Sequence, residues 1–246
     1  MHPGSIPGEA SSAPAVTGSV LPMIPDFSEQ RLKMVDSQLR TTDVTSIPVQ
    51  EAMLKIPREA FVPARRRELA YIDEDILLSG AETSGNARYL MEPSPFGKML
   101  QLADIQKSDF VLDIGCATGY SAAVLSQLAG SVVALESDAG LAELATSALN
   151  TLGCDTVAVV QGPLEMGYPS EAPYDVILLN GSVDRVPQAL FDQLRDGGRL
   201  VTVEGSGLAG VARLYIKEEG IVAPRRGFNA AVKPLPGFSA APVFEF

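Results

Sequence analysis

The sequence predicts an α/β fold built on a doubly wound, mostly parallel sheet, and three observations support this prediction. Short, continuous apolar runs alternate with segments of helical periodicity through the second half of the chain, which is typical of parallel strands buried on both faces. A glycine-bearing turn connects the first of these runs to the helix that follows it. The chain has 246 residues, of which 46% are hydrophobic and 20% are charged, so it can bury a sizeable core.

The alternation of strands and helices begins at residue 110. Apolar runs predict five strands, at residues 110–114, 132–135, 157–160, 176–179 and 200–203. The segments between them predict helices at residues 121–128, 139–149 and 188–194. Residues 214–246 contain short strand-like pieces interrupted by proline and glycine, and we expect them to form an antiparallel edge of the sheet.

The first half of the chain predicts helices and loops. Apolar residues recur at helical spacings of three and four in residues 28–40, with Asp26 or Ser28 as the N-cap, and these residues are Leu32, Val35 and Leu39. Two further helices are predicted at residues 49–54 and 95–103. The polar and aromatic stretch between them, residues 57–93, is expected to be rich in loops.

These patterns divide the chain into three parts. Residues 1–22 consist mostly of Gly, Pro, Ser and Ala, and such a segment buries too little apolar surface to offset its ordering entropy. We expect it to be a disordered or vector-derived tail. Residues 23–109 are expected to form an N-terminal helical and loop-rich cap, and residues 110–246 the α/β domain.

The composition excludes several classes of function. The formal net charge of −11 argues against a protein that binds the nucleic-acid backbone. The single histidine is His2, so the folded part has no Ser-His-Asp triad and no histidine-ligated metal site. Two cysteines, Cys116 and Cys154, form neither a disulfide framework nor a four-thiolate metal site, and they fit a reduced, cytoplasmic setting. The sequence contains no apolar run of the ~20 residues that a membrane span needs and no secretory signal pattern.

The glycine-bearing turn carries the first functional signal. Residues 113–119, Asp-Ile-Gly-Cys-Ala-Thr-Gly, leave a strand and enter a helix, whose N-terminus offers free N–H groups to a ligand. Glu136 closes the next strand, 17 residues after Gly119, where a carboxylate can accept both hydroxyls of a ribose. Glycines in such a turn also serve tight packing of helix on strand, but the turn and the acid together favour a nucleoside site.

The spacing of the glycines limits the type of nucleoside ligand that the turn can bind. Gly115 and Gly119 do not match the G-x-G-x-x-G pattern of dinucleotide sites, and the chain contains no G-K-[ST] segment of a phosphate-binding loop. An adenosine-type ligand without a pyrophosphate fits better. The sequence therefore points to S-adenosylmethionine as the cofactor.

The same segment also carries a family resemblance. Residues 111–125, from Val-Leu-Asp-Ile-Gly to Gly-Tyr-Ser-Ala-Ala-Val-Leu, resemble the first motif of the protein-L-isoaspartate O-methyltransferases. Further similar segments follow in family order at residues 34–39, 56–63, 70–71, 167–169, 172–175, 186–187 and 193–201. The resemblance runs from about Arg31 to Val203. It implies a Rossmann-like class I methyltransferase fold, S-adenosylmethionine as cofactor with S-adenosylhomocysteine as product, and protein repair by methylation of L-isoaspartyl carboxylates, with residues 23–109 on the substrate side.

The resemblance also implies a set of cofactor-binding residues. We expect them to be Leu90, Met91, Asp113, Gly115, Cys116, Gly119, Tyr120, Glu136, Ser137, Pro163, Leu164 and Asn180. Pro163 and Leu164 would lie near the adenine. The family has Gly-Asp-Gly where this chain has Gly-Pro-Leu at residues 162–164, so an acidic group and one N–H are missing there. We therefore expect a weaker or differently seated cofactor.

A second departure concerns the methyl-transfer site. The family's Thr-Ile-Ser-Gln-Pro segment corresponds to residues 89–93, Tyr-Leu-Met-Glu-Pro, so Met91 stands at the position of the serine. A thioether cannot donate the hydrogen bond of a hydroxyl. The catalytic residue is therefore unassigned, and the isoaspartyl specificity is open. Ser94 is predicted to cap the following helix and not to replace the missing serine.

Three functions stay open at this point. The first is methylation of a carboxylate on a protein, peptide or small molecule, which the lack of histidine favours because a carboxylate is ionised at pH 7 without a general base. The second is a methyltransferase of the same fold with another acceptor, using Asp, Glu or Tyr as base. The third is a non-catalytic module that binds the cofactor.

DNA methylation is disfavoured, since residues 180–184 lack a segment that would stack an extruded base and no Pro-Cys pair occurs. Cys116 is interpreted as a packing residue, and Asn180 and Asp184 as turn or cap residues and not metal ligands.

Overall fold

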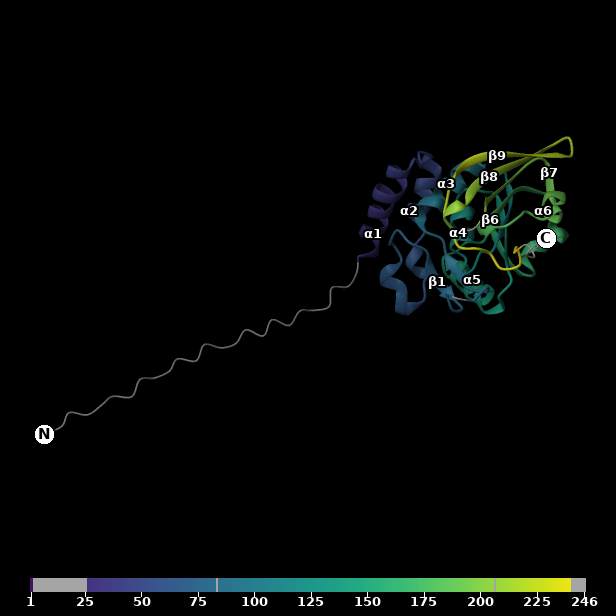
Figure 1. Cartoon of the computed structure of the whole chain (residues 1–246). Coiled ribbons are helices and arrows are strands. Elements are labelled where there is room, and N and C mark those ends of the chain that lie inside the picture. Colours follow the sequence, from purple (N-terminus) through teal and green to yellow (C-terminus); the bar gives the residue numbers. More distant parts are fainter. Residues whose placement is uncertain (2–25, 83, 206, 240–246) are drawn as a thin grey trace, which may run out of the picture.

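The predicted α/β class is confirmed by a computed structural model, which describes Met1 and residues 26–82, 84–205 and 207–239 (Figure 1). Its centre is a seven-stranded sheet with the strand order β5-β4-β3-β6-β7-β8-β9. Strands β3 to β7 run parallel to their neighbours, and β8 and β9 add an antiparallel edge. The strands are β3 (Phe110–Ile114), β4 (Ser131–Glu136), β5 (Val157–Gln161), β6 (Tyr174–Val183), β7 (Leu194–Glu204), β8 (Val211–Glu218) and β9 (Ile221–Asn229).

Helices cover both faces of this sheet, as a doubly wound fold requires. One apolar cluster joins α3, α4 and α5 to one face of the strands, and the other cluster joins α6 and Leu235 to the opposite face. The helices are α1 (Phe27–Met34), α2 (Ile47–Lys55), α3 (Pro93–Ala103), α4 (Tyr120–Ser126), α5 (Ala139–Thr151) and α6 (Gln188–Asp192). In the part of the chain that the structure describes, no helix is long and apolar enough to cross a membrane.

The first predicted helix, residues 28–40, is wrong as a single regular helix. Asp26 caps α1 by accepting from the N–H groups of Ser28 and Glu29, so Ser28 is not the cap. The α-helix ends at Met34 and continues as the π-helix Val35–Leu39 and a 3₁₀ turn, Arg40–Thr42. Ser37, Thr41 and Thr42 donate their hydroxyls back to carbonyls one turn earlier, and such bonds compete with the regular ladder. Leu32 is 47% exposed, whereas Val35 and Leu39 are buried.

The loop-rich segment, residues 57–93, contains more structure than the sequence predicts. It forms two 3₁₀ helices, Arg58–Phe61 and Ala64–Leu69, and the antiparallel strands β1 (Ile76–Ser79) and β2 (Arg88–Leu90). The helix after it, α3, begins at Pro93 with Glu92 at the N-cap position, so the prediction that Ser94 caps this helix is wrong. Instead, the Ser94 hydroxyl donates to Thr42 Oγ1 at 2.9 Å.

The C-terminal part also differs from the prediction. Residues 211–229 form one long hairpin of β8 and β9, not short pieces. After this hairpin, residues 230–239 return across the sheet, where Ser182 N donates to Lys233 O and Leu235 N donates to Ser182 O, both at 2.9 Å. Leu194 belongs to β7 and not to the preceding helix. The predicted tail, residues 1–22, falls outside the described residues except for Met1, and residues 240–246 also lie outside them.

Candidate active site

The sheet topology places the candidate site at the carboxyl ends of β3, β4 and β6. The chain runs from β3 to β4 and β5 on one side, and then crosses to β6 on the other side of β3. In open α/β sheets, ligands bind at such a switch point. The glycine-bearing turn follows β3, Glu136 ends β4, and Asn180 lies near the end of β6.

The two glycines of the turn have different roles. Gly115 and Gly119 both have a positive φ, +80° and +95°, which glycine adopts without a steric penalty. A Cβ on Gly119 would lie 3.1 Å from Cβ of Ala145 in α5, so this glycine serves close packing of the turn on that helix. A Cβ on Gly115 would lie 2.7 Å from Leu235 Cδ2 and 3.1 Å from Arg88 Nη2, on the side where a ligand would approach.

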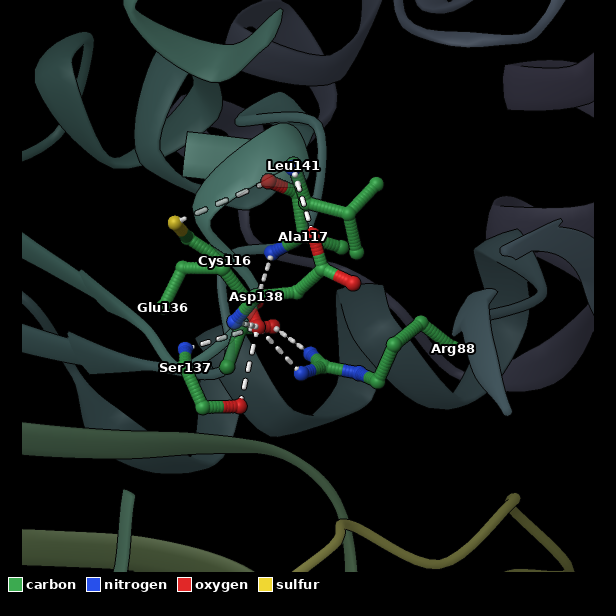
Figure 2. Close-up of polar contacts among 8 residues, drawn as sticks. Arg88, Cys116, Ala117, Glu136, Ser137, Asp138 and Leu141 are labelled. Carbon is green, nitrogen blue, oxygen red and sulfur yellow. Dashed lines mark hydrogen bonds and ion pairs between the residues drawn. The ribbon is translucent and has the colours of Figure 1, made fainter. Parts of the chain in front are cut away.

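Glu136, the predicted ribose-binding acid, is fully buried and already has several donors (Figure 2). Its Oε2 accepts from Ala117 N at 2.8 Å. Its Oε1 accepts from Ser137 N at 2.8 Å, from Ser137 Oγ at 3.3 Å and from Asp138 N at 3.1 Å. The Arg88 Nη1 group donates to the same Oε1 at 2.6 Å and forms an ion pair with it. The carboxylate is therefore rigidly held at the mouth of the turn.

Arg88 is a site residue that the sequence analysis missed. It lies in β2, three residues before Met91, inside a segment that carries no regular periodicity. The only sequence signal was an arginine next to the Tyr89–Pro93 segment, and nothing in that segment indicates which carboxylate the arginine meets.

Asp113 is the second buried carboxyl group of the site. It accepts from the Ser121 hydroxyl at 2.7 Å and from the Asn180 side-chain amide. The pairing of β6 with β7 shifts register between Leu178 and Ser182, and such bulges re-aim a side chain. Burial raises the pKa of Asp113 to about 7, against the opposing effect of its two hydrogen bonds.

Met91 lies with several predicted cofactor residues around a small cavity of about 20 Å³, a volume near that of one water molecule. Leu90, Cys116, Tyr120 and Asn180 line the same cavity. Burial raises the pKa of the Cys116 thiol well above its usual value, so this residue stays a protonated thiol and packs as an apolar group, as predicted.

Arg88 also lines a larger, open cavity of about 360 Å³. Ser137, Pro163 and Leu164, three of the residues predicted to bind the cofactor, line it together with Asp138. Its volume is within the range of small-molecule sites. Pro163 has no N–H to donate to an adenine nitrogen.

These residues fit an adenosine-type cofactor, with one condition. The open cavity, the buried carboxylate and the turn after β3 lie in the order in which such a molecule has its base, its ribose and its amino-acid end. However, Oε1 of Glu136 accepts four hydrogen bonds, one of them from Arg88. Arg88 therefore occupies one of the two carboxylate oxygens that a ribose diol would use. Gly119, one of the predicted residues, faces Ala145 and Leu149 of α5.

Comparison with known proteins identifies the family of this chain. A sequence profile of the family described as protein-L-isoaspartate(D-aspartate) O-methyltransferase matches residues 29–225. The chain is 38% identical over 196 residues to protein-L-isoaspartate O-methyltransferase 1 of Rhodopseudomonas palustris (strain HaA2), which covers 78% of each chain. It is 39% identical over 185 residues to the protein-L-isoaspartate O-methyltransferase of Koribacter versatilis (strain Ellin345), covering 75% of this chain and 81% of that relative.

Solved structures give the same result. A protein-L-isoaspartate O-methyltransferase structure superposes with a TM-score of 0.74 at 28% identity, covering 84% of this chain and 66% of the other. A beta-aspartate methyltransferase of Plasmodium falciparum, solved in complex with S-adenosyl-L-homocysteine, superposes with a TM-score of 0.71 over 83% of this chain and 97% of the other. Since that pair is only 17% identical, it establishes the fold alone. From the profile match and the relatives we conclude that the chain belongs to the protein-L-isoaspartate O-methyltransferase family.

Proposed function

We propose that this protein is an S-adenosylmethionine-dependent O-methyltransferase that methylates a carboxylate, with L-isoaspartyl residues of peptides and proteins as its acceptors. The observation that carries the proposal is the position of Glu136. This carboxylate ends β4, accepts from Ala117 N of the glycine-bearing turn, and lies next to the open cavity lined by Ser137, Pro163 and Leu164. Family membership gives the reaction and the acceptor class.

In methyl transfer from a sulfonium, the protein mainly aligns the acceptor oxygen with the methyl group and excludes water. When bound, the cofactor supplies an electrophilic methyl group on a sulfonium. We assign most of the cofactor contacts to residues of 110–246 and the acceptor to the cap formed by residues 23–109. Leu90 and Met91 of this cap line one cavity with Cys116 and Asn180. Burial of Met91, at 7% exposure, supports a water-poor transfer site. A carboxylate acceptor needs no general base.

A different acceptor in the same site is the second candidate, and Glu92 is the observation that favours it. This residue follows Met91, and burial together with the carboxylates of Asp75, Asp73 and Glu74 raises its pKa to about 7. A carboxyl group with such a pKa can serve as a general base for a hydroxyl acceptor at neutral pH. A non-catalytic module that binds the cofactor is the third candidate, which Met91 at the serine position favours.

We further propose a cytoplasmic location and no nucleic-acid partner. Both cysteines in the described residues are free thiols and buried, which suits a reducing compartment. The net charge of −11 opposes binding to a phosphate backbone.

Transfer of labelled methyl from S-adenosylmethionine tests the proposal. The acceptor is an isoaspartyl peptide, the control is the same peptide with a normal aspartyl residue, and release of methanol by mild base identifies a methyl ester. Label specific to the isoaspartyl peptide is expected. Label only on other molecules in a cell extract supports the second candidate, and cofactor binding without any labelled product supports the third.

A further inference from the structure

Arg88 and Glu136 form a buried ion pair at the place where the cofactor's ribose is expected to bind. Their side chains are 4% and 0% exposed, and Arg88 Nη1 lies 2.6 Å from Glu136 Oε1. The other end of the guanidinium, Nη2, donates to the carbonyl of Gly115 at 3.0 Å. One cation therefore contacts both elements that a nucleoside would use, the acid at the end of β4 and the turn after β3 (Figure 2).

Leu235 completes this arrangement from the far end of the chain. Its backbone is fixed to Ser182 of β6, and its Cδ2 lies next to the place of a Cβ on Gly115. Arg88 and Leu235 thus fill the space in front of the glycine. Arg88 lines the open cavity with Ser137 and Leu164, and Arg88 and Leu235 together line another small cavity with Met91.

On the basis of the proposed function, we propose that Arg88 is a built-in competitor of the cofactor and determines its affinity. The ribose hydroxyls and the Arg88 guanidinium are alternative partners of Glu136. Binding is then an exchange, in which one buried, charge-assisted contact is given up for another. A site whose acid is already paired binds more weakly than one whose acid is free, because the ligand gains only the difference between the two partners.

A second carboxylate offers a place for the displaced guanidinium. Asp75 and Arg88 line one small cavity together with Met91 and Asn180. The Asp75 carboxylate accepts from Glu92 N at 2.9 Å, and burial raises its pKa. Movement of Arg88 from Glu136 toward Asp75 keeps the cation next to a carboxylate. It also removes the guanidinium from the face of Gly115, which Leu235 still borders.

Binding of S-adenosylhomocysteine to the full chain, measured by titration calorimetry, tests this inference. Arg88→Gln removes the competing charge, and we expect it to bind S-adenosylhomocysteine at least about ten times more tightly than the unsubstituted protein. Arg195→Gln is the matched control, since Arg195 pairs with Asp175 in a half-exposed ion pair at the opposite ends of the strands. This control is expected to bind as the unsubstituted protein does. Equal or weaker binding by a folded Arg88→Gln overturns the inference.

A second variant, Arg88→Lys, keeps the inference testable if Arg88→Gln does not fold. Its ammonium keeps the charge but cannot contact Glu136 and the Gly115 carbonyl with the fork of a guanidinium. Lysine is therefore a poorer competitor, and tighter binding than in the unsubstituted protein is again expected, while no gain overturns the inference. Thermal unfolding with and without S-adenosylhomocysteine gives a second readout, because the stabilisation by the ligand grows with its affinity.

The inference and the proposed function fail in different ways. Methyl transfer to the isoaspartyl peptide without a gain in affinity for either Arg88 variant leaves the function standing and removes the competitor role. Tighter binding by the variants with no methylated product from any acceptor keeps the competitor role and removes the function.

Discussion

The Arg58 guanidinium donates from Nη2 to the carbonyl of Met91 at 2.7 Å, although the arginine is fully buried and distant from the surface. Its Nε donates to the carbonyl of Ala70, also at 2.7 Å, and its Cζ lies 4.9 Å from the centre of the Tyr120 ring. One cation thus connects Ala70, Met91 and the Tyr120 ring in the first turn of α4. The backbone of Met91 is held by this contact and not by a regular strand or helix.

Replacement of this arginine is expected to destabilise the fold. Arg58→Lys loses the two-pronged contact with Ala70 and Met91 while it leaves a charge in an apolar site. We expect the free energy of unfolding to fall by about 2–4 kcal/mol in urea titrations. Arg195→Lys, at a half-exposed ion pair, is the control and should change stability little. A loss at Arg58 no larger than in this control would contradict the role of Arg58.

Restoring a hydroxyl at the methyl-transfer position is expected to raise activity. Met91→Ser supplies a hydrogen-bond donor that the thioether lacks, and one such bond corresponds to about a tenfold increase in rate. The initial rate of methyl transfer to the isoaspartyl peptide measures this effect. Met166→Ser, at a methionine that is 53% exposed, serves as control. An unchanged or lower rate in Met91→Ser would show that the missing serine does not limit this reaction.

Loss of charge at Glu136 is expected to weaken the cofactor site. Glu136→Gln removes the negative charge and turns an amide NH₂ toward N–H donors of Ala117, Ser137 or Asp138. Hydrogen bonds to a charged group contribute about 1.5–3 kcal/mol, which corresponds to roughly 10- to 100-fold in affinity. Because Glu136→Gln also weakens the competing contact of Arg88, affinity for S-adenosylhomocysteine should fall by less than this full amount. Glu171→Gln, on the surface, is the control. Affinity that matches this control would refute Glu136 as the ribose-binding acid.

The carboxyl group of Glu92 is expected to make stability depend on pH. Its pKa in the folded protein is raised to about 7 from a usual value of 4.5, chiefly by burial and then by Asp75, Asp73 and Glu74. The folded state therefore holds this proton more tightly than the unfolded state, and stability falls as pH rises from about 4.5 to about 7. Glu92→Gln should match the unsubstituted protein at pH 4.5 and exceed its thermal stability at pH 8. Parallel melting curves across this range would be inconsistent with the raised pKa.

The parallel half of the fold could be predicted because its strands contain continuous apolar runs, and the central strands β3, β4 and β6 are buried on both faces. Continuous apolar runs mark such strands directly, and β3, β4 and β5 match the predicted runs to within one residue at either end. Glu136 could also be predicted, because it directly follows the apolar run that marks β4.

The remaining features depend on contacts that the local sequence does not encode. Strand β9 is mostly exposed, so its sequence contains no apolar run that would predict a strand. Strands β1 and β2 are short and pair only with each other. Arg88 meets Glu136 across 48 residues of chain, and Leu235 reaches Gly115 only because residues 230–239 return over the sheet. The irregular continuation of α1 depends on hydroxyls that bond back to the helix carbonyls, which periodicity cannot reveal.

A crystal structure of the protein with S-adenosylhomocysteine tests the proposed site most directly. We predict the ribose hydroxyls within hydrogen-bond distance of the Glu136 carboxylate, the adenine between Ser137 and Leu164, and the Arg88 guanidinium away from Glu136. A nucleoside bound elsewhere, or bound while Arg88 still pairs with Glu136, would contradict the account.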